Sequence, residues 1–440
     1  MIIAFLVWYS SQIYVNRYKF LKDKLEQKDA VIGVIGLGYV GLPLAVLLSR
    51  KGFRIQGFLR HEDKVVQLNN GENDLGDESL TESLKSELKK GNLSVSTLSK
   101  DKLASCDVYM VCVPTPVTES KKPDLTALKS VAGQLKELDL AGKLIINEST
   151  VAPTMTRAVF GELSDVEYFL ACSPERIDPG NGLKEVSNIA KVLGGLNENS
   201  LQLAYVLYKQ ILSADVVTVS SLEAAEMTKM LENTYRAVNI ALINEVAQLC
   251  EMLDLDVLEI VKAASSKWSF HAHYPGVGVG GHCIPVDPYY LLKLATENKV
   301  DMNVVRQSLL TNESMPTKFA EKIKSEYKDG MKVLLYGVTY KKDVADLRES
   351  PVLELMKILN ERKIKFMVYE PILSEEELKR LGITNAKLQI ADMLIVGTGH
   401  TVLNEDYKKL VGKNTIVIDG RNFFLNKVGH SVIGVGRKLQ

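Results

Sequence analysis

A glycine-rich turn near the start of the chain constrains the fold most. It fits the pattern G-x-G-x-x-G over residues 36–41, follows the apolar run 30–35 and precedes a helical stretch. In a strand-turn-helix unit of this kind, the first glycine makes the tight turn, the second admits a pyrophosphate, and the third lets helix pack on strand. Free N–H groups at the helix start favour the phosphates. The motif predicts a dinucleotide site comprising Gly36, Gly38, Tyr39, Val40 and Gly41, with a turn that binds no ligand as the alternative.

The residue that selects the dinucleotide departs from the usual pattern. An acidic residue is expected ~20 positions after the glycines, where it binds the ribose 2′-hydroxyl of NAD. The chain has Leu59 there, followed by Arg60. Leucine cannot accept this hydrogen bond, whereas Arg60 could pair with the 2′-phosphate of NADP. Glu62 or Asp63 could substitute from the next turn. We therefore expect NAD, keep NADP as an alternative, and take Arg60 as a candidate cofactor contact.

The rest of the chain predicts an α/β protein of several domains. With 440 residues it exceeds a single compact core. Strand-like runs alternate with helical stretches in both halves, which is typical of doubly wound parallel sheets. Residues 222–253 lack Gly and Pro and place apolar residues at helical spacing, so they predict one long helix. We expect a helical extension (1–29), a Rossmann dinucleotide-binding domain (30–215), a central helical region (216–328) and a second Rossmann-like domain (329–440).

Charge, cysteine content and the N-terminus argue against several classes of protein. Lys+Arg and Asp+Glu both number 54, which argues against broad nucleic-acid binding. The apolar start, residues 1–9, is about half the ~20 residues that span a bilayer, and no basic region precedes it. We expect no stable membrane insertion there, and an extended or packed segment rather than a membrane-contacting helix. The five scattered cysteines form no C-x-x-C pair, which favours free thiols, a cytoplasmic location and no metal site.

One cysteine lies in a loop rich in glycine and proline, residues 274–288. The glycines allow close backbone approach, so a substrate carbon could reach the sulfur of Cys283. A thiol that adds to an aldehyde forms a thiohemiacetal, which can lose a hydride to leave a thioester for hydrolysis. Asp287 could orient the water or accept a proton. The loop thus predicts a nucleophile for oxidation of an alcohol to an acid, with a buried structural cysteine as the alternative.

Two further features bear on this thiol. His282 could act as its base, but adjacent loop residues often point in opposite directions, so we expect its side chain to point away from Cys283. On the long helix, Lys229 and Asn233 are four residues apart and share a face. An ammonium and an amide aimed at one oxygen would stabilise the oxyanion that forms when the thiol attacks. A solvated lysine is the ordinary alternative.

With these features in place, the chain resembles the UDP-glucose/GDP-mannose dehydrogenase family from about Ala30 to Asn422. Seven motifs in family order carry the resemblance. They are Gly36–Gly41, Val113-Pro114-Thr115-Pro116, Glu148-Ser149-Thr150-Val151, Ser173-Pro174-Glu175-Arg176, Lys229 with Asn233, Gly280–Asp287, and Tyr340-Lys341-Lys342-Asp343 with Asp346-Leu347-Arg348-Glu349-Ser350.

The resemblance implies an NAD-binding domain, a long central helix used in dimerisation, and a C-terminal domain that binds the UDP portion of the substrate. It implies two successive hydride transfers to two cofactor molecules. Cys283 is then the nucleophile, Glu175 the general acid/base, and Lys229, Asn233 and Asp287 stabilise charge or position water. Further residues would contact the cofactor or the substrate: Pro114, Thr115, Thr150 and Arg348 the cofactor, and Arg176, Tyr274, Gly280, Lys341 and Arg421 the substrate, together with Glu175, Lys229 and Asn233.

Within the family, residues 281–290 are similar to the UDP-N-acetylhexosamine branch. UDP-glucose enzymes tend to carry a lysine where this chain has Val286. Residues 175–181 favour the glucosamine enzymes of that branch, so the resemblance implies four-electron oxidation of UDP-N-acetylglucosamine at C6 for polysaccharide or glycan precursors. UDP-N-acetylmannosamine and UDP-glucose remain alternatives. A two-electron hydroxyacid-type reductase and a non-catalytic nucleotide-sugar-binding protein represent other classes.

Overall fold

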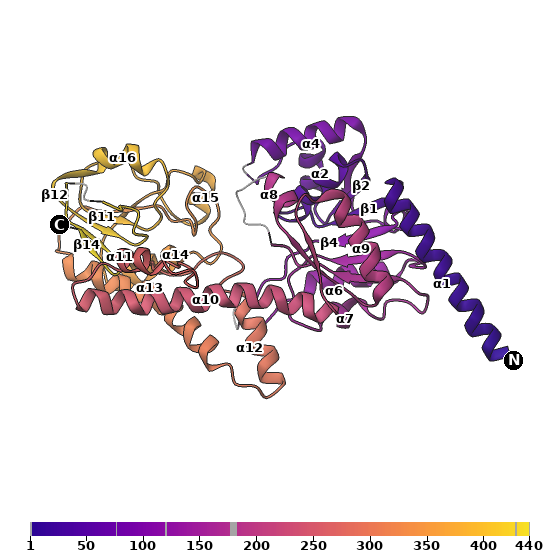
Figure 1. Ribbon diagram of the computed structural model, residues 1–440. Helices are drawn as coiled ribbons and strands as arrows, with labels where there is room; N and C mark the ends of the chain where they lie inside the picture. The colour runs from indigo at the N-terminus through magenta and orange to yellow at the C-terminus, as the bar shows by residue number, and fades with distance from the viewer. Residues whose placement is uncertain (1, 76, 119–120, 177–182, 427–428, 440) are drawn as a thin grey trace. The chain divides into compact units, whose positions relative to one another are not determined.

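The computed structural model describes residues 2–75, 77–118, 121–176, 183–426 and 429–439. The chain divides into two compact units, Met1–Leu231 and Glu232–Gln440. Each unit contains one sheet with helices packed against it (Figure 1).

The sheet of the first unit has the strand order β3-β2-β1-β4-β5-β6-β7-β8. The order reverses beside β1, so β1 and β4 flank the switch point at which α/β sheets bind ligands. Neighbouring strands are parallel except β6 and β7. The strands are β1 (Val31–Ile35), β2 (Arg54–Leu59), β3 (Leu93–Thr97), β4 (Val108–Val111), β5 (Leu144–Asn147), β6 (Phe169–Cys172), β7 (Lys191–Gly195) and β8 (Val216–Thr218).

Alternating side chains of these strands enter two separate apolar cores. On β4, for example, Val108 and Met110 pack into one core, whereas Tyr109 and Val111 pack into the other. Burial on both faces explains why these strands read as apolar runs. The helices are α1 (Ile2–Gln27), α2 (Gly41–Arg50), α3 (Glu62–Asn69), α4 (Glu78–Lys90), α5 (Lys100–Ala104), α6 (Thr126–Lys136), α7 (Met155–Phe160), α8 (Leu183–Asn188) and α9 (Glu198–Ile211).

The N-terminal helix α1 begins at the second residue of the chain. It starts at Ile2 and so includes the apolar start of the chain, which the sequence analysis expected to be extended or packed. Its C-terminal part packs against α9, where Gln210 donates a hydrogen bond to the carbonyl of Leu25 at 2.6 Å. Within the described residues, no helix combines the length and the apolar character that crossing a membrane would need.

The second unit holds a sheet of order β10-β9-β11-β12-β13-β14, parallel except for the last pair. Its strands are β9 (Val333–Tyr336), β10 (Met367–Tyr369), β11 (Ala391–Val396), β12 (Val411–Asp419), β13 (Val432–Gly434) and β14 (Lys438–Leu439). The predicted long helix is α10 (Leu222–Met252), which contains the boundary between the units. The remaining helices are α11 (Val257–Ala264), α12 (Asp287–Glu297), α13 (Asn303–Glu326), α14 (Pro351–Glu361), α15 (Glu375–Arg380) and α16 (Leu403–Leu410).

The prediction of two α/β domains with parallel sheets is confirmed, and each sheet adds one antiparallel pair: β7 runs antiparallel to β6, and β14 antiparallel to β13. Neither β7 nor β14 was predicted as a strand. β7 begins with a lysine and ends with two glycines, which weakens its apolar pattern. Its side chains are nevertheless fully enclosed, and its direction places Lys191 near the end of β6.

Candidate active site

The glycine turn after β1 needs two of its three glycines for reasons of space and conformation. Gly36 has φ +93°, and a Cβ there would lie 2.6 Å from the carbonyl oxygen of Cys112. A Cβ at Gly41 would lie 1.8 Å from the carbonyl oxygen of Gly36. Tyr39 and Val40 complete the turn, and Val40 is the residue that caps α2. The turn is therefore built so that the first turn of α2 sits directly against the end of β1.

Gly38 differs, because a Cβ there would meet no protein atom within 4 Å. We expect Gly38→Ala to leave the thermal midpoint nearly unchanged but to weaken dinucleotide binding by roughly tenfold or more, since a methyl group would occupy the approach path of a pyrophosphate. Gly133→Ala is the matched control, because its Cβ also meets nothing and the residue lies in α6. Calorimetric titration with NAD checks both variants. Equal affinities would contradict the assignment of Gly38.

The segments after β4 and β5 meet at the same edge of the sheet. Thr115 follows β4, and its hydroxyl donates a hydrogen bond to the carbonyl of Thr150, which follows β5, at 2.6 Å. Pro114 is exposed beside it. Because β1 and β4 are neighbours, these residues and the glycine turn share the carboxyl edge where a dinucleotide would bind. Arg60 is exposed, directly follows β2, and is separated from the start of α3 by His61 alone.

A buried ionic cluster lies behind the ends of β5 and β6. The ammonium of Lys191, on β7, forms ion pairs with Glu148 and, at 2.7 Å, with Glu175. The hydroxyl of Tyr208 on α9 donates a hydrogen bond to Glu148. Glu175 also accepts a hydrogen bond from the backbone N–H of Arg176 at 2.5 Å. Glu175 and Arg176 were predicted from the sequence, whereas Glu148 appeared there only as part of a motif and Lys191 and Tyr208 were not predicted. A lysine at the start of an otherwise apolar strand was the available signal.

Burial and charge work against each other in this cluster. Burial raises the pKa of Glu148 to about 7, although Lys191 acts to lower it. Burial also disfavours the charged ammonium, but the attraction of the two carboxylates is stronger and raises the pKa of Lys191 above its usual value. The cluster therefore holds a permanent cation next to Glu175. It has one more carboxyl group than it has cations.

In the second unit, the glycines of the loop 274–288, the cysteine loop, allow it to pack closely against another segment. A Cβ at Gly280 would lie 2.6 Å from Cβ of Tyr340, and a Cβ at Gly281 would lie 2.8 Å from the ring of Tyr340. A Cβ at Gly278 would lie 2.7 Å from Pro351. The space beside these three glycines is thus filled by the segment 340–351. The loop's small residues bring it against that segment, an explanation that the sequence analysis did not consider.

Cys283 differs from the other four cysteines, which are all buried, because its side chain is partly exposed. Its Sγ lies 2.9 Å from Nδ1 of His282. The expectation that His282 points away from the thiol was therefore wrong. The backbone at Cys283 is held by the turn that begins α12, where the N–H groups of Val286 and Asp287 both donate to the carbonyl of Cys283. A thiol beside an imidazole can transfer its proton to it and become the more reactive thiolate.

The two predicted helix residues are both buried. Lys229 is 9% exposed, which is unusual for a lysine on a helix surface. Asn233 donates a hydrogen bond from its amide to the carboxylate of Asp287 at 2.5 Å, and Asp287 begins α12. The structure thus pairs Asn233 with Asp287, a contact that the sequence analysis did not foresee. Tyr274, at the start of the loop, is exposed.

Arg421 connects three segments of the second unit. Its guanidinium donates hydrogen bonds to the carbonyls of Gly278 in the cysteine loop, Tyr340 and Gly397, at 3.1, 3.3 and 3.2 Å. Burial lowers the pKa of Arg421 to about 10. Arg348 is exposed and forms an ion pair with Asp346 at 2.5 Å, while its carbonyl accepts a hydrogen bond from the N–H of Gly281.

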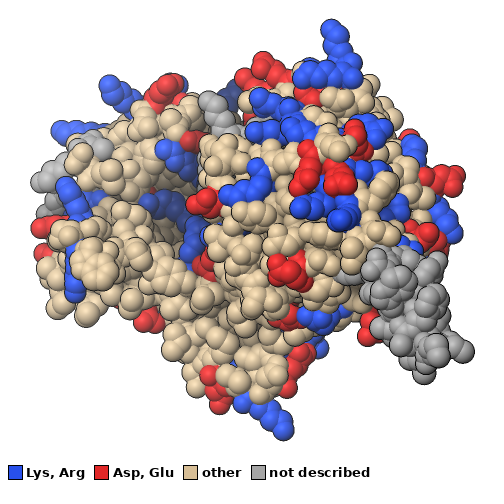
Figure 2. Space-filling model, turned by 45° about the vertical axis from the view of Figure 1, so that its right-hand side comes forward, with Lys and Arg blue, Asp and Glu red and all other residues tan. Residues whose placement is uncertain are grey.

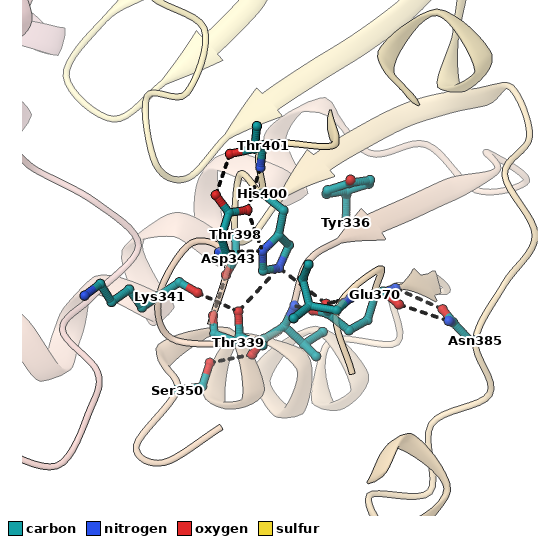
Figure 3. A network of polar contacts seen from close by, with 12 residues as sticks. Tyr336, Thr339, Lys341, Asp343, Ser350, Glu370, Asn385, Thr398, His400 and Thr401 are labelled. Atoms are coloured by element: carbon teal, nitrogen blue, oxygen red, sulfur yellow. Dashed lines mark hydrogen bonds and ion pairs between the residues drawn. The ribbon is translucent and has the colours of Figure 1, made fainter. Parts of the chain in front are cut away.

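A second buried network holds the segment that carries Lys341 (Figure 3). Nδ1 of His400 accepts a hydrogen bond from the backbone N–H of Asp343 at 3.0 Å, so its Nε2 carries the proton and faces Glu370 at 3.4 Å. Although burial raises the pKa of Glu370, hydrogen bonds from His400 and from backbone amides lower it below its usual value. The hydroxyl of Thr339 donates a hydrogen bond to the carbonyl of Lys341 at 2.9 Å. Sequence reasoning missed His400 and Glu370.

Charges of both signs are interspersed over the face shown in Figure 2. Among the described residues, no group of three or more His, Cys, Asp or Glu is arranged to hold a metal ion. His271 and His273 instead contact the ring of Tyr235. The choice between the two hexosamines depended in part on residues 175–181. Of these, Glu175 and Arg176 are described, whereas residues 177–181 lie outside the described residues.

Comparison with protein families matches three long segments of the chain to the domains of one family. The NAD binding domain of the UDP-glucose/GDP-mannose dehydrogenase family matches residues 30–212, its central domain residues 223–314, and its UDP binding domain residues 334–426.

Individual relatives agree with this result. A UDP-N-acetyl-D-mannosamine dehydrogenase of Methanococcus aeolicus is 34% identical over 91% of this chain and 93% of the relative. A UDP-N-acetyl-D-glucosamine 6-dehydrogenase of Pseudomonas aeruginosa is 36% identical over 81% of this chain and 86% of the relative. Among solved structures, a UDP-glucose dehydrogenase from Pyrobaculum islandicum has a TM-score of 0.84 at 26% identity and covers 93% of this chain and 98% of its own.

Proposed function

The chain belongs to the UDP-glucose/GDP-mannose dehydrogenase family, and we propose that within it the protein oxidises the C6 alcohol of UDP-N-acetylglucosamine to the carboxylate. The observation that carries the oxidation to the acid is Cys283, a partly exposed thiol 2.9 Å from an imidazole. A dehydrogenase that stops at the aldehyde needs no such nucleophile. The product would serve as a precursor of surface polysaccharides or glycans.

The chemistry divides between the cofactor and the protein. The glycine turn would hold NAD, which when bound would supply the hydride acceptor for each of the two oxidations, with one cofactor molecule for each hydride. His282 takes the proton of Cys283, and the thiolate forms a C–S bond with the carbon of the intermediate aldehyde. Lys229 stabilises the resulting alkoxide by its positive charge, with Asn233 and Asp287 positioning charge and water. After the second oxidation the sugar is held as a thioester.

Hydrolysis of the thioester completes the reaction. Glu175 accepts a proton from water as its oxygen attacks the acyl carbon, and Thr150 helps to hold that water. The C–S bond then breaks, the sulfur leaves as the thiolate of Cys283, and the sugar leaves as the carboxylate. A thiol that must stay reduced between turnovers is consistent with a cytoplasmic location.

The stoichiometry of the reaction tests this function. Purified protein is incubated with NAD and a panel of UDP-sugars that includes the N-acetylglucosamine, N-acetylmannosamine and glucose derivatives. We expect two molecules of reduced cofactor for each sugar acid. One reduced cofactor per substrate would instead identify a two-electron dehydrogenase, and no reduction with any sugar would identify a binding protein. The relatives named for both hexosamines make UDP-N-acetylmannosamine the second candidate.

The choice of cofactor depends on the end of β2. Arg60 is exposed at this position, and Leu59 offers no carboxylate to a ribose 2′-hydroxyl. We expect Arg60→Ala to lower kcat/KM for NADP about tenfold and to leave the value for NAD within about twofold, because only NADP carries a 2′-phosphate for the guanidinium. Initial rates with both cofactors check this. Equal losses would show that Arg60 does not read the 2′-phosphate.

We further propose that the protein is a homodimer or a higher homo-oligomer. Several large apolar side chains of α10 are exposed in the single chain, and a second copy would cover them. They are Leu231, Leu242, Leu249 and Met252.

A further inference from the structure

We propose that Lys191 is a positioning residue that keeps Glu175 ionised and oriented to accept the proton of the hydrolytic water. This inference rests on the proposed function, because it concerns the thioester-hydrolysis step. Lys191 itself contacts no reacting atom in this proposal. It acts through Glu175, to which its ammonium is bound at 2.7 Å.

The fold explains how a lysine from one strand reaches this carboxylate. β7 is antiparallel to β6, with Cys172 opposite Gly194 and Ala171 opposite Gly195. The start of β7 therefore lies beyond the C-terminal end of β6, where the chain continues to Glu175. Lys191 is 2% exposed and Glu175 is 7% exposed, so water screens their interaction little. A parallel β7 would have placed Lys191 at the opposite edge of the sheet.

Burial and pairing act in opposite directions on the carboxyl groups of the cluster. Two carboxyl groups share one ammonium, and like charges in a small buried space disfavour double ionisation. Burial raises the pKa of Glu148 to about 7, although Lys191 and the hydrogen bond from Tyr208 act to lower it. The ammonium of Lys191 lies 2.7 Å from Glu175 and favours the ionised form of that carboxyl group, which is the form that can act as a base.

Three other titratable groups near the cluster carry no charge near neutral pH. Burial raises the pKa values of Cys112, Cys172 and Tyr208 well above their usual ranges, so these groups are neutral at neutral pH. The guanidinium of Arg176 donates to the carbonyl of Ala190 at 2.6 Å. Replacing Lys191 by a neutral side chain removes the ammonium that lies 2.7 Å from Glu175.

The test is the pH profile of sugar-acid formation by Lys191→Met. Removing a cation in contact with a carboxylate raises its pKa by about one to two units. Because the base must be ionised, activity is lost as pH falls through this pKa, so we expect the acidic limb of kcat to move to higher pH by about one to two units. Near neutral pH, intact-protein mass spectrometry should show a sugar acyl group accumulating on Cys283. Lys191→Gln carries the same prediction if the methionine variant does not fold.

Two control variants separate positioning from general damage to the fold. Glu148→Gln mimics the neutral form of that carboxyl, so we expect its acidic limb to stay at or below the wild-type pH. Lys143→Met removes a partly buried lysine of the same unit that bonds to the carbonyl of Ala104 at 2.8 Å, away from the cluster. Its limb should coincide with that of the wild type. A purely structural role of Lys191 would lower the thermal midpoint and the rate at every pH without moving the limb.

The outcomes distinguish this inference from the function on which it rests. If the wild type forms sugar acid and the limbs of Lys191→Met and Lys191→Gln coincide with the wild-type limb, the role of Lys191 is wrong and the function stands. If the wild type reduces no cofactor with any UDP-sugar, the function is wrong and the inference falls with it. An independent readout is the carbonyl stretch of protonated carboxyl groups in infrared difference spectra. It should strengthen in Lys191→Met near neutral pH, and an unchanged band would also contradict the inference.

Discussion

Replacing Cys283 by serine should abolish formation of the sugar acid, with a fall of at least about 10³-fold in the rate of complete oxidation. A serine hydroxyl beside His282 is a far weaker nucleophile than a thiolate, so the intermediate aldehyde is not captured and no thioester forms. Two measurements check this: the amount of sugar acid formed, and the ratio of reduced cofactor to substrate consumed. That ratio should fall from two towards one as aldehyde is released.

Cys250→Ser is the matched control for this variant. Cys250 is buried in α10 within the same unit and is not part of the loop around Cys283. It tests the effect of losing a thiol that has no proposed chemical role, and it should keep the two-to-one ratio even if its stability is lower. Undiminished sugar-acid formation by Cys283→Ser would eliminate the thioester mechanism.

The second large effect is expected for Glu175→Gln. A glutamine cannot accept the proton of the hydrolytic water, so the rate of thioester hydrolysis should fall by about 10²- to 10⁴-fold. The residues proposed for the steps before hydrolysis, Cys283, His282 and Lys229, are unchanged in this variant. Rapid mixing should therefore still show a burst of reduced cofactor in the first turnover, followed by a very slow steady state. Mass spectrometry should find the acyl group on Cys283.

Glu87→Gln provides the comparison for this variant. Glu87 is another buried glutamate of the first unit, but it lies on α4 and interacts with Ser49 and Lys90. Its replacement should reduce stability without trapping the acyl enzyme. A Glu175→Gln variant that hydrolyses the thioester at the wild-type rate would show that another group is the base.

Much of the fold could be predicted because the strands that form it are enclosed on both faces. The runs that became β1, β4 and β5 are short, apolar and bounded by turn residues, and the absence of Gly and Pro from α10 indicated one long helix. The direction of the strands was harder to predict. The length and composition of the connection between β6 and β7 do not show that these two strands are antiparallel. β7 also carries a lysine whose charge is balanced only by residues far away in the sequence.

The candidate site divides in a similar way. Cys283, Glu175 and Lys229 could be proposed because each lies in a local motif. The contacts between other residues of the site could not be identified from spacing. The contact between Asn233 and Asp287 joins residues 54 positions apart, and that between Glu148 and Tyr208 residues 60 positions apart. The direction of the His282 side chain, with Nδ1 2.9 Å from the sulfur of Cys283, is not specified by a pattern of residue types.

The three hydrogen bonds of Arg421 have a practical consequence for protein engineering. Because one guanidinium binds the backbones of the cysteine loop, of Tyr340 and of Gly397, these segments behave as a single part. The filled space beside Gly278, Gly280 and Gly281 adds a steric match between the first two. A chimera that takes only the cysteine loop from a relative would combine it with a segment 340–351 whose shape matches the original loop. Exchanges meant to alter substrate choice should transplant residues 274–288 together with 337–351.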